Sequence, residues 1–200
     1  APMIKRYVAS LSLAALASAA PAWAEWQVAD NSDIQFVSIK NNTIGEVSHF
    51  DMIAGTVGDQ GAVEVRVALD SVETNIGIRN DRMKKMLFEV GLYPEAVITA
   101  QLSPETMAVL GSSSGSAVPV VLQIDLHGQV VSKDAVLTVS ATDAGGFSAT
   151  TSQPILLNAA EFNLEDGVAA LQSVAGLNAI SRVIPVTVSL NFTKVAAASP

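Results

Sequence analysis

Histidines and carboxylates are the side chains of this 200-residue chain that could perform chemistry, and their spacing does not favour catalysis. Neither His49 nor His127 has a partner at i+2, i+3 or i+4 that completes a metal-binding motif. Because a metal site needs three or four convergent ligands, metal binding stands at roughly one in ten against a structural or surface role. Glu161, Glu165 and Asp166 are close in sequence, but in so acidic a chain they indicate a solvated loop.

Other catalytic motifs are missing from the sequence. It contains no Gly-x-Ser-x-Gly nucleophile elbow, no phosphate-binding loop and no dinucleotide fingerprint. It contains no cysteine, which excludes disulfides, thiolate metal sites and cysteine nucleophiles. We therefore predict no catalytic residue, metal or cofactor.

The segment 71–94 carries the most informative charged side chains. Arg79 and Asp81 stand between a polar turn and an apolar run. An arginine there could offer planar donors to an anionic head group, with Asn75 as a further candidate. A local Arg79–Asp81 pair that orders the turn explains the same residues equally well.

The apolar run that follows also has two interpretations. Met83, Met86, Leu87 and Val90 have helical spacing and predict a helix over Asn80–Val90. Helical Met and Leu residues are usually core. However, methionine adapts its shape to varied apolar ligands, so the run could instead close one end of a ligand pocket.

The rest of the chain is dominated by a hydrophobic period of two, which predicts amphipathic strands. Turn signals separate these strands, and the pattern indicates one antiparallel barrel or sandwich. Short helices are expected at Ser103–Glu105 and Asp166–Ala175. The predicted strands are Ser32–Ile39, Gly45–Val57, Ala62–Asp70, Ala96–Leu102, Val118–Leu126, Val136–Ala141 and Val183–Phe192.

The first residues predict export from the cytoplasm. A basic start, a short apolar run and a small-x-small pattern ending at Ala24 are typical of a cleaved signal peptide over residues 1–24. The apolar run is too short for a membrane anchor, which needs about 20 apolar residues. We expect one domain over residues 25–195, with no transmembrane segment, and a disordered tail over residues 196–200.

The charge of the expected mature chain argues against nucleic acid as a partner. The full chain has a net charge of −8, and removal of Lys5 and Arg6 leaves 9 basic residues against 19 acidic ones. Nucleic-acid binding is driven by neutralisation of phosphates, which such a chain cannot supply.

Several motifs together resemble the YceI-like family of bacterial periplasmic lipid-binding proteins. The resemblance covers residues 25–195, and it departs from the family pattern at Arg82, Leu87 and Val131. The matching motifs are Ser71-Val72-x-Thr74, Arg79-x-Asp81, Phe88, Tyr93-Pro94, Trp26, Phe36, Gly45 to Gly55 with Phe50, Leu126-x-Gly128, Val136-Leu137-x-Val139 and Phe162-x-Leu164.

This resemblance implies an all-β fold: a single lipocalin-like antiparallel barrel of about eight strands, with one or two short helices at one end. It implies a periplasmic protein that holds a polyisoprenoid, isoprenoid quinone or fatty-acid derivative in its lumen. Head-group contacts are expected from Asn75, Arg79 and Asp81. The expected lumen and lid residues are Phe36, Phe50, Val65, Val67, Leu69, Ile76, Met83, Met86, Leu87, Phe88, Leu92, Leu122, Ile124, Phe147 and Phe162.

Two other functions fit the same pattern. An enzyme acting on a hydrophobic substrate would need a titratable group inside the barrel, but alternation directs Asp125 and His127 away from the apolar face. A stress-response protein with a fully packed core would need no ligand. The chain could also form a homodimer.

Overall fold

The computed structural model describes residues 24–112 and 114–196; the predicted signal peptide except for Ala24, and most of the predicted tail, lie outside these residues. Antiparallel strands dominate the fold. Within the described residues they are β1 (Ala24–Val28), β2 (Asp33–Lys40), β3 (Ile44–Phe50), β4 (Ile53–Gly58), β5 (Ala62–Ala68), β6 (Val72–Glu73), β7 (Glu95–Gln101), β8 (Ser116–Leu126), β9 (Gln129–Ala141), β10 (Phe147–Thr151), β11 (Ile155–Asn158) and β12 (Val183–Lys194).

Strand β1 closes the sheet into a barrel, because it pairs with β4 on one side and with β12 on the other. The closed ring runs β1-β4-β5-β7-β8-β9-β10-β12 and returns to β1. Strands β2, β3 and β6 continue the wall from β12, and β11 pairs with the first part of β12. The predicted all-β antiparallel barrel of about eight strands is confirmed.

Alternation along β5 shows why these residues form a barrel wall. Val65 and Val67 are buried in the interior, whereas Glu64 and Arg66, which alternate with them, are exposed. Outside the wall, Arg66 donates to Glu64 and to Glu95 on the neighbouring β7. A strand of this kind is stable only with one face in the core and the other in water.

The predicted strand Gly45–Val57 is divided in the structure. It breaks at Asp51 and Met52, so β3 and β4 are separate. The backbone groups freed at the break bond to the next segment: Asp51 N–H donates to Ser71 O, and Met52 O accepts from Ala68 N–H. These long-range hydrogen bonds leave no trace in the hydrophobic pattern.

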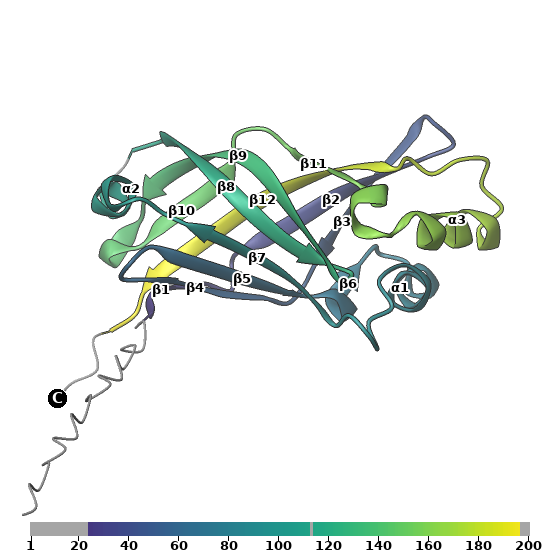
Figure 1. Cartoon of the computed structure of the whole chain (residues 1–200), viewed down its shortest axis with the longest axis horizontal. Coiled ribbons are helices and arrows are strands. Elements are labelled where there is room, and N and C mark those ends of the chain that lie inside the picture. The colour runs from purple at the N-terminus through teal and green to yellow at the C-terminus, as the bar shows by residue number, and fades with distance from the viewer. Residues whose placement is uncertain (1–23, 113, 197–200) are drawn as a thin grey trace, which may run out of the picture.

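Short helices cover the two ends of the barrel (Figure 1). At one end lie α1 (Gly77–Arg82), the π-helical turn η2 (Met83–Leu87) and α3 (Glu165–Val174); α2 (Pro104–Val109) lies at the opposite end. As predicted, α2 begins after a capping Ser103, whose hydroxyl accepts from Thr106 N–H. Short 3₁₀ turns complete the elements: η1 (Leu69–Ser71), η3 (Asp143–Gly145) and η4 (Ala159–Phe162).

The predicted helix Asn80–Val90 differs from the observed one in position and in type. It begins at Gly77, and its second half is a π-turn, in which Phe88 N–H donates to Met83 O over 2.9 Å. Glu89, with φ +50°, follows this turn. A π-turn changes which side chains share a face, since its hydrogen bonds join residues i and i+5.

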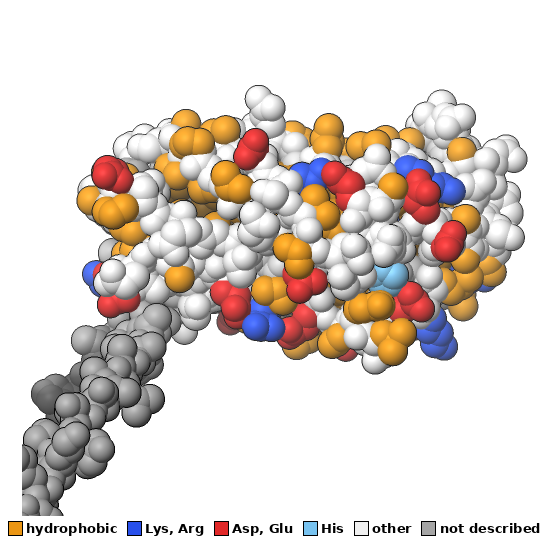
Figure 2. All heavy atoms as spheres, viewed as in Figure 1, with side chains coloured by type: hydrophobic (Ala, Val, Ile, Leu, Met, Phe, Trp, Pro, Cys, Tyr) orange, Lys and Arg blue, Asp and Glu red, His pale blue; other side chains and the backbone are white. Residues whose placement is uncertain are grey.

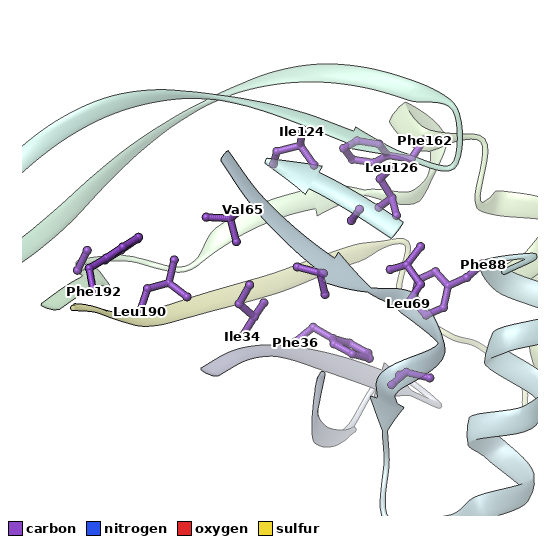
Figure 3. Packing of buried hydrophobic residues seen from close by; sticks show 14 of the residues in the cluster. Ile34, Phe36, Val65, Leu69, Phe88, Ile124, Leu126, Phe162, Leu190 and Phe192 are labelled. Carbon is purple, nitrogen blue, oxygen red and sulfur yellow. The ribbon is translucent and has the colours of Figure 1, made fainter. Parts of the chain in front are cut away.

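The core lies along the barrel axis, where side chains from opposite walls face one another (Figure 3). Near β1, Trp26 packs edge-to-face on Phe147 with 5.6 Å between ring centroids, and Phe147 stacks on Phe192 at 4.7 Å. Buried Leu110, which follows α2, also lines the interior. Near α1, Phe50 packs between Phe36 and Phe88.

Candidate functional site

The barrel encloses a cavity of about 530 Å³. Its walls are the inward-facing residues of the strands, closed at the helical end by parts of α1, η2 and α3. The volume falls within the range of small-molecule pockets, roughly 300–1,000 Å³. The barrel interior is therefore not filled by its own side chains.

Thirteen of the fifteen predicted lumen and lid residues line this cavity. Figure 3 shows several of them projecting between the strands. Their contact with a ligand stays a prediction. The lining residues are Phe36, Phe50, Val65, Val67, Leu69, Ile76, Met83, Leu87, Phe88, Leu122, Ile124, Phe147 and Phe162.

The structure places the other two, Met86 and Leu92, off the cavity wall. Leu92 is 72% exposed in the loop after η2. Met86 was placed by α-helical spacing, but the π-turn pairs Met83 with Phe88 instead. These two residues therefore do not line the cavity, and the helix type is the physical reason for Met86; their contact with a ligand from the lid stays a prediction.

The inward-facing residues of β2 and β3 change from apolar to charged along their length. On β2 the lining residues run Ile34, Phe36, Ser38 and Lys40, and on β3 they run Phe50, Ser48 and Glu46. Register brings the matching positions together, because Phe36 is opposite Ser48 and Ser38 is opposite Glu46. The β2–β3 hairpin therefore gives the cavity an apolar depth and a polar mouth.

Arg79, Glu46 and Lys40 form the centre of this mouth. Glu46 Oε2 lies 2.5 Å from Arg79 Nη1 and 3.0 Å from Lys40 Nζ. The hydrogen bond from Lys40, reinforced by Arg79, lowers the pKa of the Glu46 carboxyl against the opposing effect of burial. One carboxylate thus joins two cations and ties α1 to the β2–β3 hairpin.

Arg79 is held in place by the turn that precedes α1. Its Nη2 donates to Thr74 O over 2.6 Å. The turn itself is ordered by buried Asn80, whose Oδ1 accepts from Thr74 N–H at 2.9 Å and from Thr74 Oγ1 at 2.5 Å. Among the described residues, one buried side-chain nitrogen or oxygen lacks a hydrogen-bond partner, and it is Arg79 Nε. Arg79 Nε is therefore available to donate a hydrogen bond to a ligand at the cavity wall.

The other two head-group candidates lie elsewhere. Asp81 is exposed and does not line the cavity, and Arg79 pairs with Glu46 rather than with Asp81. Asn75 is also exposed; it adopts a φ of +62°, and its N–H donates to Glu73. Asn75 and Asp81 therefore do not line the cavity, and their contact with a head group stays a prediction.

Sequence reasoning missed Lys40, Glu46 and Arg82, the remaining charged side chains of the cavity lining. The Arg82 side chain makes no hydrogen bond or ion pair with any described residue. Inward alternation on β2 and β3 could have suggested Lys40 and Glu46. No local pattern indicates that Glu46 meets Arg79.

The histidines and Asp125 are outside the lumen. His127 follows β8, where its Nε2 lies 2.7 Å from Glu89 and its Nδ1 lies 3.1 Å from Phe162 O. Asp125 is exposed and His49 pairs with Asp51, and none of the three residues lines the cavity. In the described part of the chain, no cluster of three His, Asp or Glu side chains is arranged to hold a metal.

Comparison with known proteins agrees with this architecture. A model of the YceI-like domain matches residues 26–192. The chain belongs to the YceI-like family. No curated protein matches this YceI-like chain. Within residues 24–112 and 114–196 of this protein, no helix has the length and apolar character needed to cross a membrane.

Solved structures support the family assignment and the fold. A polyisoprenoid-binding domain from Saccharophagus degradans, implicated in plant cell wall breakdown, is 32% identical to this YceI-like chain. The match covers 86% of this chain and all of that domain, with a TM-score of 0.82. BcnA from Burkholderia cenocepacia is 16% identical over 81% of this chain and 96% of its own, with a TM-score of 0.63, and shows the shared fold.

Proposed function

We propose that this YceI-like protein binds and carries a long-chain amphiphilic lipid in its barrel lumen. The observation that carries the proposal is the distribution of charge around the cavity of about 530 Å³. The barrel walls present apolar side chains, while the charged ones belong to β2, β3 and the α1 segment. A ligand that matches this distribution has a long apolar tail and a polar head.

Burial of the tail would supply most of the affinity. Each buried methylene contributes about 0.8 kcal/mol, so ten of them contribute about 8 kcal/mol before the entropic cost of binding. No precise polar contact is needed along the tail. This suits a polyisoprenoid, an isoprenoid quinone or a fatty-acid derivative.

The head group would lie against the mouth. Arg79 has an unpaired, buried Nε there, and Arg82 is one helical turn away on the same face. Both guanidinium groups can donate to the oxygen atoms of a head group. The related Saccharophagus domain, described as polyisoprenoid-binding, supports an isoprenoid as the first ligand to test.

We place this function in the periplasm. The support is the leader-like pattern of residues 1–24. Fractionation of a bacterium that expresses the full chain would test the placement. We expect the mature protein, beginning at Glu25, in the periplasmic fraction.

The binding proposal is tested by extraction of the natively purified protein. Organic extraction followed by mass spectrometry should release a long-chain lipid in an amount comparable to the protein. Denatured and refolded protein should take up an added polyprenol. A protein that releases no lipid and takes up none after refolding would contradict lumen binding.

An enzymatic function has no comparable support. The titratable side chains at the cavity are Lys40, Glu46, Arg79 and Arg82, all at the mouth. Glu46, the one carboxylate among them, is held ionised by two cations, since its pKa is lowered. Such a carboxylate is a poor proton acceptor near neutral pH.

A further inference from the structure

The cavity mouth is bordered by apolar side chains that water reaches. Ile76 is 45% exposed, Ile78 is 61% exposed and Val174 is 45% exposed, and each of them also lines the cavity. Ile76 and Ile78 come from the start of α1, and Val174 is the last residue of α3. Single exposed apolar residues are common on proteins. These three, by contrast, line one cavity as well as meeting water, and we call them the apolar collar.

Cations accompany the apolar collar. The charged side chains of the cavity lining are three cations, Lys40, Arg79 and Arg82, and one carboxylate, Glu46. Lys84 and Lys85 follow directly on η2. Figure 2 shows hydrophobic side chains at the surface of the α1 and α3 end, with Lys and Arg as well as Asp and Glu side chains beside them. The lining of the mouth therefore has a local positive charge on a chain whose net charge is −8.

We propose that this end of the barrel docks on an anionic lipid bilayer, with the apolar collar inserted among the head groups and the cations against the phosphates. The proposal rests on the proposed function, since it assumes that the lumen exchanges a lipid with a membrane. Exposed apolar side chains ringed by cations are the features by which monotopic proteins bind anionic interfaces.

The position of the collar explains why a bilayer fits better than a soluble partner. The collar residues belong to the cavity wall itself, so a tail that leaves the bilayer between them enters the lumen without crossing water. Arg82, which has no partner among the described residues, is free to meet a lipid phosphate. The Arg79–Glu46 pair, in contrast, joins two elements of the mouth and stays within the protein.

Two variants at the mouth, one in the apolar collar and one at the neighbouring Arg82, are compared with two controls elsewhere on the barrel. Ile78→Asp places a charge in the apolar collar, and Arg82→Glu reverses the unpaired cation. Val121→Asp is the control for Ile78→Asp, because it places the same charge at an apolar residue that is 54% exposed on the outer wall of β8. Lys194→Glu reverses a cation away from the mouth, at the end of β12, where Lys194 lies 3.5 Å from Glu25 on β1; urea unfolding of this variant checks that the fold survives the loss of that pair.

The measurement is flotation of each purified protein with vesicles of phosphatidylcholine alone and of equal parts phosphatidylcholine and phosphatidylglycerol. The parent protein should bind the anionic vesicles, less strongly at high salt. Ile78→Asp should weaken binding about tenfold or more. Arg82→Glu should weaken it by at least about fivefold, the effect of one interfacial cation. The two controls should float as the parent does.

Extraction of lipid from the same variants separates this proposal from lumen binding. The docking proposal alone would be overturned if the protein retains its lipid but does not float with anionic vesicles. It would also be overturned if Ile78→Asp and Arg82→Glu both retain their lipid and float as the parent does. Protein that floats through the collar but yields no lipid would contradict lumen binding alone. Capture of the collar by a protein rather than by vesicles would also overturn docking on lipid.

Discussion

Arg79 and Glu46 are 33 residues apart in sequence and meet at the mouth of the cavity, with 2.5 Å between Nη1 and Oε2. Their contact connects α1, which covers the end of the barrel, to the hairpin that forms its rim. Lys40 shares the same carboxylate oxygen. The mouth is thus assembled from two segments that are distant in sequence. The β2–β3 hairpin supplies Lys40 and Glu46, and α1 supplies Arg79.

The Glu46 carboxyl should make stability depend on pH in the acidic range. Its pKa is lowered from the usual 4.5 by Lys40 and Arg79, so its contribution is complete above pH 4.5 and is lost as pH falls through the lowered value. At neutral pH, Glu46→Gln should reduce the free energy of unfolding by about 0.5–1 kcal/mol, because the group is partly exposed. The difference between variant and parent should shrink below pH 4.5 in urea unfolding experiments. If the difference in free energy of unfolding between variant and parent stays constant with pH, the ion pairs of Glu46 do not contribute to stability.

Asn80 should be essential to the turn that carries Arg79. Asn80→Ala leaves the buried N–H of Thr74 without its acceptor, which should cost about 1–3 kcal/mol. For a domain of this size the melting temperature should fall by roughly 3–10 °C. Thr74→Val, which removes the hydroxyl but keeps the N–H bonded to Asn80, should cost less. Equal effects of the two variants would contradict the role given to the backbone bond.

Gly167 sets how closely α3 approaches η2. A Cβ at this position would lie 2.7 Å from Met86 O and 3.0 Å from Leu87 Cα. Gly167→Ala must therefore push the two segments apart, and we expect a loss of about 1–3 kcal/mol in the free energy of unfolding. Gly91→Ala is the matched control at the same end, because a Cβ added there would meet no atom within 4 Å. The control should unfold at nearly the parental urea concentration.

The deep end of the cavity should limit the length of the lipid tail. Ala100 on β7 lines the cavity, as do Leu102 and Leu110 near α2. Ala100→Trp should fill this end and shift the extracted lipids toward shorter tails. Ala62→Trp places the same side chain on the exposed face of the neighbouring β5 and should leave the lipid profile unchanged. Identical lipid profiles from both variants would contradict the position of the tail.

The barrel could be predicted from the sequence because its signal is local. Alternation along segments such as Ala62–Ala68 and Ser116–Leu126 fixes which face is buried, and the strands observed there follow it. Seven of the thirteen predicted residues that line the cavity are on strands and follow this alternation: Phe36, Phe50, Val65, Val67, Leu122, Ile124 and Phe147. The export signal and the periplasmic location remain predictions.

The mouth could be predicted only in part, because its geometry is not local. Arg79 lines the cavity as predicted, but its partner Glu46 comes from another strand. Met86 does not line the cavity, because a π-turn replaces the α-helical spacing that the sequence suggests. Asn75, at positive φ in the turn, and Asp81, on the exposed side of α1, do not line the cavity, which their residue types alone do not reveal.

Native mass spectrometry of the purified protein tests lipid binding in the lumen most directly. We expect a chain that carries one bound molecule, which collisional activation releases and which fragments as a long-chain lipid. Ala100→Trp should bind a lighter molecule, and Ala62→Trp the parental one. A mass that matches the bare polypeptide, both as purified and after incubation with polyprenol, would contradict the proposal.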